Sequence, residues 1–503
     1  MGIIAKQSVR GTIWTYLGVG VGIITTFVVI TRFLTAEEIG LARVLIDAAT
    51  LFIGLAQIGT GTSIIRFFPY FKTKESGESA DPYHGFFFWT VVIPLVGFCV
   101  FALIYWLCRI PICSYFEEKS PLFVDYYYLV LPIAFFMLYQ LVFETSSNVL
   151  LRTVFPHSVV REFLVRLLML VLYLLYAKRV VTLDGFVAGL CVVYAIAALC
   201  NIVYVFATEH ISLRPDFSFP TRQLVLRYLQ YTGFLIISAA VTVFAPLLSS
   251  FMVSAKMGLE YNGIYTIAFN IAVMISIPAR AMWAVTQPQL ASAIKEDDMP
   301  AASVLVRQVS GSLLLVGSFI FLAIWLNIDL LFHILPNGAT YAVAKNAVFF
   351  LCLTQLLITS LNILTATMSY SRYYYITLIF SLLLTVLLIM LNNHLIPRFG
   401  IDGAALATTI GQSFYFLCML LVIKYVVRIS PVGTKHLGTI CLLAGVLGLN
   451  YIWCTFLSPI VGNLWLDSIG RTVVLLSVAA LTAYKTGLSP EINYQIDKYI
   501  RHK

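Results

Sequence analysis

The sequence predicts an all-α polytopic membrane protein with about 14 transmembrane helices. Two observations carry this prediction. Of the 503 residues, 60% are hydrophobic and only 11% are charged, and the mean hydropathy is +0.93, whereas a soluble domain needs far more charge on its surface. The apolar runs are also long and continuous, without the alternation of a membrane β-barrel, so helices are the spanning structure that satisfies the backbone.

A bilayer core about 30 Å thick is crossed by roughly 20 apolar residues in a helix. This criterion predicts spans at residues 12–33, 41–65, 86–107, 126–150, 159–177, 183–207, 229–253, 263–289, 311–334, 345–370, 373–393, 403–426, 437–456 and 468–485. The first of these is interpreted as a retained helix and not a signal peptide, because no small-residue cleavage site follows Lys6 and Arg10.

The distribution of basic residues predicts the orientation. With the N-terminus in the cytoplasm, the inner loops and tails collect about 20 Lys and Arg, and the outer loops collect about 9. Both termini are therefore predicted to be cytoplasmic. The net charge of +9 then follows from topology, and no basic module typical of nucleic-acid binding is present.

The cysteine and histidine spacings give no sign of a bound metal. The nine cysteines are scattered and mostly lie inside the predicted spans, and no CxxC motif occurs. No His lies at ligand spacing from a Cys or from another His. We therefore predict neither a metal nor another cofactor.

Two pairs of similar turns predict an internal duplication. Ala36–Leu41 (AEEIGL) resembles Leu259–Ile264 (LEYNGI), and Leu183–Ala188 (LDGFVA) resembles Ile401–Leu406 (IDGAAL), about 220 residues later in both cases. An even number of helices per copy gives a parallel repeat, with its axis along the membrane normal. We predict two six-helix lobes, 1–212 and 213–430, followed by two C-terminal helices and a cytoplasmic tail within 431–503.

Polar residues inside the predicted second helix mark a candidate site. They recur every three or four positions, which places them on one helical face: Arg43, Asp47, Thr50, Gly54, Gln57 and Gly61. Charges inside a span are costly and usually face a cavity. The alternative is that Arg43 and Asp47, one turn apart, only neutralise each other.

The matching helix of the second half carries Thr266, Asn270 and Arg280, and Arg280 corresponds to Gln57 in the repeat. The alternative for Arg280 is a side chain that snorkels to the cytoplasmic interface. In the fourth helix, Glu144 is either a proton or cation site or the partner of Arg43 or Arg152.

The six-plus-six-plus-two pattern, together with two segments, resembles the multidrug/oligosaccharidyl-lipid/polysaccharide (MOP) exporter superfamily. Arg32–Thr35 (RFLT), followed by Glu37–Gly40 (EEIG), is similar to its first loop, and Phe399–Ala407 is similar to its loop into the twelfth helix. Within the superfamily, the chain is most similar to the polysaccharide transporter branch, the Wzx-like O-antigen and repeat-unit flippases. The resemblance covers about residues 5–430, and its motifs specify the superfamily better than the substrate.

This resemblance implies an undecaprenyl-diphosphate-linked oligosaccharide as substrate, moved from the inner to the outer leaflet of a bacterial inner membrane by alternating access. A diphosphate needs counter-charge to cross hydrocarbon, and Arg offers bidentate hydrogen bonds to phosphate oxygens. We assign that role to Arg43 and Arg280. The remaining predicted cavity residues are Asp47, Thr50, Gln57, Thr266 and Asn270.

Two further expectations go with the resemblance. Transport is expected to couple to H+, Na+ or the membrane potential, with Asp47 or Glu144 as the coupling residue. The expected partners are membrane lipids, a polysaccharide polymerase and glycosyltransferases, with no nucleic acid.

Three rival functions fit the residues less well. A multidrug exporter of the same superfamily extrudes organic cations, but the first predicted helix has no carboxylate and an intramembrane Arg repels such cargo. A lipid II flippase typically has an Arg-Asp pair in that helix, which this chain lacks. A membrane glycosyltransferase or polymerase needs large outer loops, whereas the longest here, Arg109–Asp125, is about 17 residues with three carboxylates. The sequence therefore predicts a transporter and not an enzyme.

Overall fold

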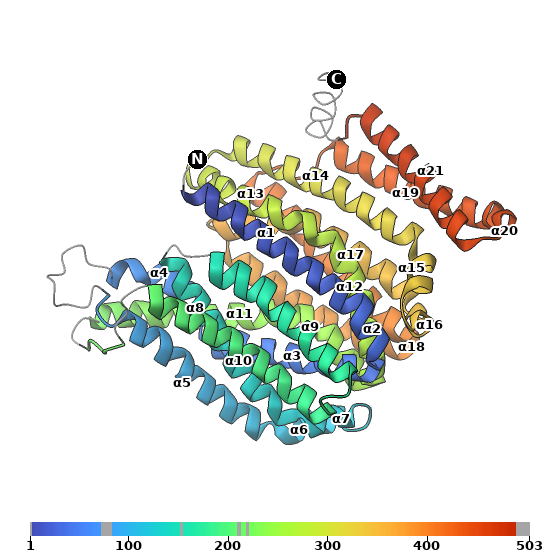
Figure 1. Ribbon diagram of the computed structural model, residues 1–503. Coiled ribbons are helices and arrows are strands. Elements are labelled where there is room, and N and C mark those ends of the chain that lie inside the picture. Colours follow the sequence, from blue (N-terminus) through green and yellow to red (C-terminus); the bar gives the residue numbers. More distant parts are fainter. Residues whose placement is uncertain (1–2, 72–82, 151–153, 209–212, 218–220, 489–503) are drawn as a thin grey trace. The chain divides into compact units, whose positions relative to one another are not determined.

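The computed structural model describes residues 3–71, 83–150, 154–208, 213–217 and 221–488, and within these ranges it contains helices and no β-strand (Figure 1). The chain forms two compact units, Met1–Gly263 and Ile264–Lys503. Eleven of the described helical segments are long and apolar enough to cross a membrane. The predicted all-α polytopic membrane fold is confirmed. The lobe boundaries at 212/213 and 430/431 stay predictions.

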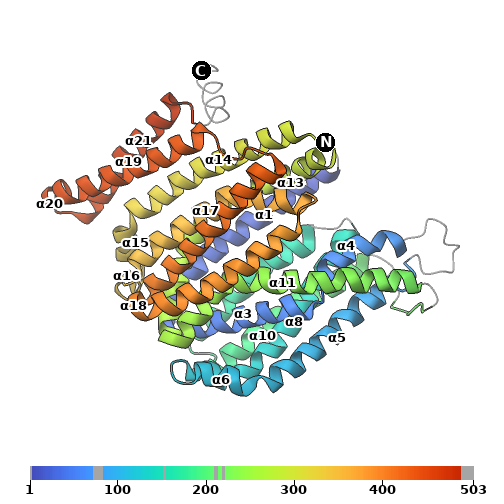
Figure 2. The same ribbon diagram turned by 180° about the vertical axis from the view of Figure 1, so that it is seen from behind.

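The first unit is built from the following elements, where η marks a π- or 3-10 helix: α1 (Ile3–Ile24), η1 (Thr25–Ile30), α2 (Thr31–Phe33), α3 (Ala36–Ala56), α4 (Thr60–Phe71), α5 (Phe86–Leu107), α6 (Arg109–Phe116), α7 (Pro121–Asp125), η2 (Tyr127–Leu129), α8 (Val130–Val149), η3 (Val154–Leu164), α9 (Val165–Ala177), α10 (Leu183–Thr208) and α11 (Arg222–Met257). In this unit α8 packs against both α3 and α10, and α11 packs along α3 (Figures 1 and 2).

Helix α12 (Leu259–Val273) begins in the first unit and continues into the second. The second unit is built from η4 (Met274–Ser276), α13 (Ile277–Lys295), α14 (Met299–Leu326), α15 (Ile328–Ile334), α16 (Gly338–Ala342), α17 (Lys345–Tyr370), α18 (Tyr375–Val422), η5 (Ile423–Val427), α19 (Thr434–Phe456), α20 (Ser458–Val461) and α21 (Leu464–Lys485). Here α17 packs against α14 and α18, and α19 and α21 form a hairpin beside α14 (Figure 2).

The segment Tyr375–Val427 covers two predicted spans, 373–393 and 403–426. The helix is broken at Gly400, which has φ 59° and ψ −135°. A Cβ on Gly411 would lie 2.7 Å from Leu388 Cδ2, whereas 23 residues of straight helix would separate these positions by about 35 Å. The two halves therefore fold back on each other as a hairpin, and a count by continuous helices underestimates the crossings. The predicted number of fourteen stays a prediction.

Two predicted spans are interrupted in the structure. The predicted helix 41–65 ends at Ala56, and Ile58 and Gly59 take positive φ values of 47° and 63° before α4 begins at Thr60. The predicted helix 263–289 contains the 3-10 turn Met274–Ser276, followed by Pro278. The apolar pattern runs through both breaks, so it gave no warning of them.

The turn before α3 is fixed by a capping box. Thr35 Oγ1 accepts from the Glu38 backbone N–H at 3.2 Å, and Glu38 Oε2 accepts from the Thr35 N–H at 2.9 Å. The hydroxyl of Tyr176 on α9 also donates to Glu38. Two otherwise unsatisfied donors at the helix start are thereby satisfied. This explains physically why the segment RFLTAEEIG contains Thr and Glu at these positions.

The two glycines of the first pair of predicted repeat turns lie against each other. A Cβ on Gly40 would overlap the carbonyl oxygen of Leu259, and a Cβ on Gly263 would overlap the carbonyl oxygen of Ala36. The first turn of α3 and the first turn of α12 are therefore in backbone contact, as small residues permit in membrane helices.

The α19–α21 hairpin is held to the end of α14 by a buried arginine. Arg471 Nη2 donates to the Leu326 carbonyl oxygen at 2.7 Å, and Arg471 Nη1 lies 3.9 Å from Asp467 Oδ2. Asp467 Oδ1 accepts from Trp453 Nε1 at 2.9 Å. Because a charge inside a span needs compensation, this network fixes how the hairpin docks.

We expect Gly40→Ala to lower the thermal unfolding midpoint of the purified chain, because the new methyl group forces α3 and α12 apart. The expected loss is about 1–3 kcal/mol of unfolding free energy. Gly20→Ala on α1 is the matched control, since no atom lies within 4 Å of its Cβ position. Equal midpoints for the two variants would contradict the backbone contact.

Candidate functional site

Arg43 and Asp47 form an ion pair inside a membrane-spanning helix. They are one turn apart on α3, with Arg43 Nε 2.8 Å from Asp47 Oδ2. Asp47 is 4% exposed, whereas 26% of the Arg43 side chain is accessible. The carboxylate is thus the anchored partner, and the arginine is the one that a ligand can approach.

Asp47 has a second partner on another helix. Ser250 of α11 lies with Oγ 3.0 Å from Asp47 Oδ2 and 3.1 Å from Asn262 Oδ1 at the start of α12. A hydroxyl has one hydrogen, which goes to the stronger acceptor, the carboxylate. Ser250 and Asn262 are both buried. Three helices of the first unit therefore meet at Asp47. No sequence pattern distinguishes Ser250 from the other serines of the same apolar run.

The other residues of the predicted polar face do not continue along one helix. Thr50 is half-buried and donates to the Ile46 carbonyl of its own helix. Gly54 faces α11, where its Cβ would lie 3.2 Å from Val243. Gln57 is the C-cap of α3, and Gly61 belongs to α4. The expectation of one continuous face from Arg43 to Gly61 is wrong, because the helix ends at Ala56.

Glu144 on α8 has two basic partners. Its Oε1 accepts from Arg161 Nη1 at 3.2 Å and lies 2.9 Å from His157 Nδ1. Glu144 is buried, with 6% of its side chain accessible, while about half of each basic side chain is exposed. The expected partner Arg43 is bonded to Asp47 instead, and Arg152 lies outside the described residues.

Both partners of Glu144 lie on the π-helix η3. A π-helix has a wider turn than an α-helix and is often found at functional sites. Helix α1 lies directly against it, since a Cβ on Gly18 would overlap the Glu162 carbonyl oxygen. The spacing of His157 and Arg161, four residues apart, was the available signal.

Tyr194 is a buried residue of α10 in the interior of the first unit. It is 8% exposed and lies within electrostatic range of both Asp47 and Arg161. The first unit thus contains two accessible guanidinium-bearing side chains, each paired with a buried carboxylate. Such an arrangement suits an anion with several oxygen acceptors, because each carboxylate fixes its arginine in place.

The three predicted residues of the second half all belong to the second unit. Thr266 is buried and Asn270 is half-buried, both on α12. Arg280 is exposed on α13, beyond the 3-10 turn. Asn270 and Arg280 are therefore on separate helices and do not share one helical face.

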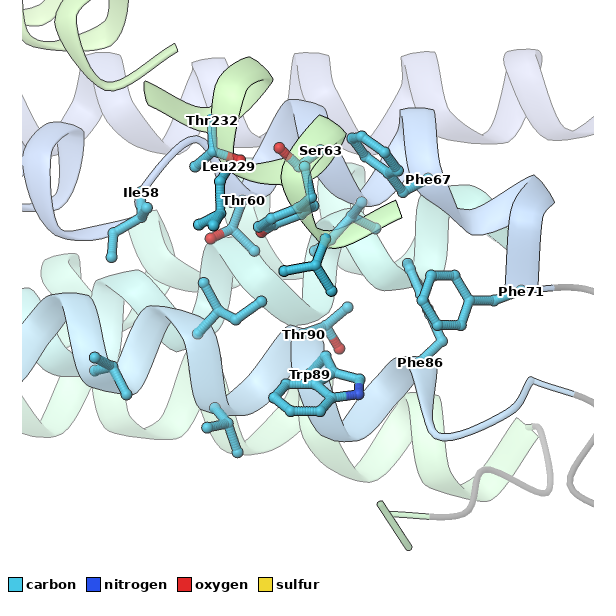
Figure 3. A pocket seen from close by; sticks show the side chains of 16 residues that line it. Ile58, Thr60, Ser63, Phe67, Phe71, Phe86, Trp89, Thr90, Leu229 and Thr232 are labelled. Atoms are coloured by element: carbon cyan, nitrogen blue, oxygen red, sulfur yellow. The ribbon is translucent and has the colours of Figure 1, made fainter. Parts of the chain in front are cut away.

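An apolar cavity of about 400 Å³ lies between α4, α5 and α11 of the first unit. Figure 3 shows Phe67, Phe86, Trp89 and Leu229 around it, with Thr232 as one of the few polar side chains. Its walls suit a hydrocarbon chain and do not offer charge to a diphosphate. Among the described residues, no group of three or more His, Cys, Asp and Glu side chains has the arrangement of a metal site.

A family model described as polysaccharide biosynthesis protein matches residues 8–293. The chain belongs to this family. The matched region includes the Arg43–Asp47 pair, Glu144 and Arg280, as well as the π-helix η3. No curated protein sequence matches the chain.

Solved structures with similar folds are transporters. The lipid II flippase MurJ in an inward closed conformation has a TM-score of 0.68 at 12% identity, covering 96% of this chain and 99% of MurJ. An inward-facing multidrug resistance MATE family transporter of the MOP superfamily has a TM-score of 0.61 at 16% identity, covering 83% of this chain and 94% of that one.

A MOP superfamily transporter from Pyrococcus furiosus has a TM-score of 0.56 at 16% identity, covering 84% of this chain and 96% of that one. Its structure is described as having a binding pocket of reverse polarity. These likenesses show the fold. The chain thus shares the fold of MOP superfamily transporters, and the family match agrees with the predicted resemblance to the polysaccharide branch.

We expect Arg161→Gln to destabilise the purified chain by about 1–3 kcal/mol, because the buried Glu144 carboxylate loses its permanent cation. Thermal unfolding in detergent measures this loss. The double variant Glu144→Gln/Arg161→Gln leaves no buried charge and is expected to recover most of it. A double variant as unstable as the single one would show that the ion pair is not the cause.

Proposed function

We propose that this chain is a flippase that moves undecaprenyl-diphosphate-linked oligosaccharide repeat units from the inner to the outer leaflet for polysaccharide synthesis, O-antigen included. The observation that carries the proposal is the accessible Arg43, fixed by a buried Asp47 inside a span of a polysaccharide biosynthesis family member. A fixed guanidinium stabilises a diphosphate where water is scarce.

Each part of the substrate has a matching chemistry in this proposal. Arg43 and Arg280 bind the diphosphate, and Arg161 joins them because about half of its side chain is accessible beside Glu144. Thr50, Gln57, Thr266 and Asn270 offer hydrogen bonds to sugar hydroxyls. The apolar cavity beside α5 accepts part of the prenyl chain, which otherwise stays in lipid. Rocking of two lobes gives alternating access.

Coupling to a gradient is a separate part of the proposal. Asp47 or Glu144 would carry the coupled H+ or Na+, and each is bonded to an arginine that would be released when the carboxylate is neutralised. Flipping assayed in proteoliposomes with imposed pH, Na+ or voltage gradients tests this. If none of the three gradients changes the flipping rate from its value without a gradient, coupling is excluded.

The cellular setting is proposed from the same family. We place the chain in a bacterial inner membrane with both termini in the cytoplasm, and we expect a polymerase and glycosyltransferases as neighbours. It acts as a transporter, without catalysis or a cofactor. The alternative is a multidrug antiporter, supported by the fold likeness to MATE transporters.

Complementation tests the proposal. In a bacterium that makes the cognate repeat unit but lacks its own flippase, we expect the wild-type chain to restore surface polysaccharide. Arg43→Ala and Arg280→Ala are expected to reduce this by about 10- to 100-fold, because each removes a charged hydrogen bond to the diphosphate. Arg109→Ala, in an exposed segment outside the spans, is the matched control and is expected to keep activity.

A double variant separates recognition from simple charge balance. Arg43→Gln/Asp47→Asn removes both charges but keeps hydrogen-bonding groups. If Arg43 only neutralises Asp47, this variant is active; if Arg43 binds the diphosphate, it stays inactive at normal membrane levels. Failure of the wild-type chain to restore polymer, together with efflux of organic cations, would favour the multidrug antiporter.

A further inference from the structure

A second, polar cavity of about 500 Å³ lies in the second unit, where the connection from α18 to α19 crosses α14. Its walls include Arg307, Gln308 and Ser312 from α14 and Gly433, Thr434 and Lys435 from the start of α19. None of these residues belongs to the candidate site described above. The cavity therefore needs an explanation of its own.

The cavity carries uncompensated positive charge. Among the described residues, neither Arg307 nor Lys435 forms an ion pair, and no acidic side chain lines the cavity. In the same unit Lys345 lies 2.5 Å from Asp329, and Arg471 has Asp467 beside it. Two cations from different helices that line one cavity without an acidic partner favour an anionic ligand.

Backbone and hydroxyl donors add to this charge. Thr434 and Lys435 form the first turn of α19, where backbone N–H groups have no partner within the helix and the helix dipole is positive. The side chains of Gln308, Ser312 and Thr434 supply further hydrogen-bond donors. The cavity thus combines charge and donors in the manner of a phosphate site.

The walls of the cavity are fixed by bonds between α14 and the following connection. Arg307 Nε and Nη2 donate to the Ser430 carbonyl oxygen at 3.4 and 3.3 Å. His436 is buried, with Nε2 2.8 Å from Ser310 Oγ and Nδ1 accepting from the Gly433 N–H at 3.2 Å. The cavity is therefore formed before a ligand arrives, which lowers the entropic cost of binding.

The cavity lies at the edge of the hydrocarbon layer. From Arg307 to the end of α14 at Leu326 the helix is about 30 Å long, the thickness of the bilayer core. Helix α19 begins at Thr434, beside the same cavity. Arg307 and Lys435 are thus at the depth of phospholipid head groups, and the apolar side chains of Val432 and Leu488 complete the lining.

We propose that this cavity binds the phosphate of an anionic phospholipid head group. Basic pockets between transmembrane helices are suited to such lipids. The bound phosphate neutralises Arg307 and Lys435 together and joins α19 to one end of α14. At the other end of α14, Arg471 of α21 makes a second connection to Leu326. The lipid is a fixed component of the second unit, independent of the transported substrate.

The test uses the full chain, purified in detergent and titrated with phosphatidylglycerol, with bound lipids counted by native mass spectrometry. We expect one phosphatidylglycerol to bind more tightly than phosphatidylcholine, and Lys435→Gln to weaken that binding about fivefold. Lys424→Gln is the matched control, because Lys424 is also an exposed cation of this unit but does not line the cavity. The Lys424→Gln variant is expected to bind phosphatidylglycerol as tightly as the wild-type chain.

Two outcomes would overturn the proposal. Equal weakening by Lys424→Gln and Lys435→Gln would show a diffuse attraction without a site. If inorganic phosphate, added without lipid, protects the wild-type chain but not Lys435→Gln against thermal unfolding while phosphatidylglycerol does not bind preferentially, the ligand is a soluble anion. Normal unfolding of the lipid-free Lys435→Gln variant confirms that it is folded.

Discussion

A carboxylate inside an apolar helix must be compensated, and the compensation of Asp47 organises the first unit. Arg43 supplies charge from the same helix, and Ser250 supplies a hydrogen bond from α11, with Asn262 of α12 against the same hydroxyl. An unpaired buried charge would cost several kcal/mol, so these helices pack at the register that brings the partners together. The contacts of Asp47 therefore fix how the helices pack and also hold Arg43 in its accessible position.

Close backbone contact supports the same arrangement. Gly40 lies about one helical turn before Arg43 on α3, and Gly263 follows Asn262 directly. With no side chain at either glycine, the first turns of α3 and α12 approach closely enough for Ser250 to contact both Asp47 and Asn262. The two similar turns thus have a physical role, since the glycine in each is the residue that lets the first turns of α3 and α12 come into backbone contact.

The sequence predicted what depends on composition and local spacing. Helical spans follow from long apolar runs, and the Arg43–Asp47 pair follows from a four-residue spacing on one helix. What it could not predict depends on residues far apart in the chain: Ser250 is one serine among many, and the contact of Arg161 with Glu144 depends on how η3 packs beside α8. The breaks at Ile58–Gly59 and Met274–Ser276 were also missed, because hydropathy does not report backbone dihedral angles.

The two ion pairs of the first unit share a feature that bears on transport. In each, the carboxylate is buried and the basic partner is accessible, 26% for the Arg43 side chain and 52% for that of Arg161. If the pairs served stability alone, both partners would gain from burial together, or from replacement by apolar residues of similar volume. An accessible cation beside a buried anion instead stays within reach of an incoming ligand. The cavity beside α5, in contrast, is lined by apolar side chains. The first unit therefore offers a cationic surface and a separate apolar cavity. An amphiphile with an anionic head group and a hydrocarbon chain is the kind of ligand that would use both.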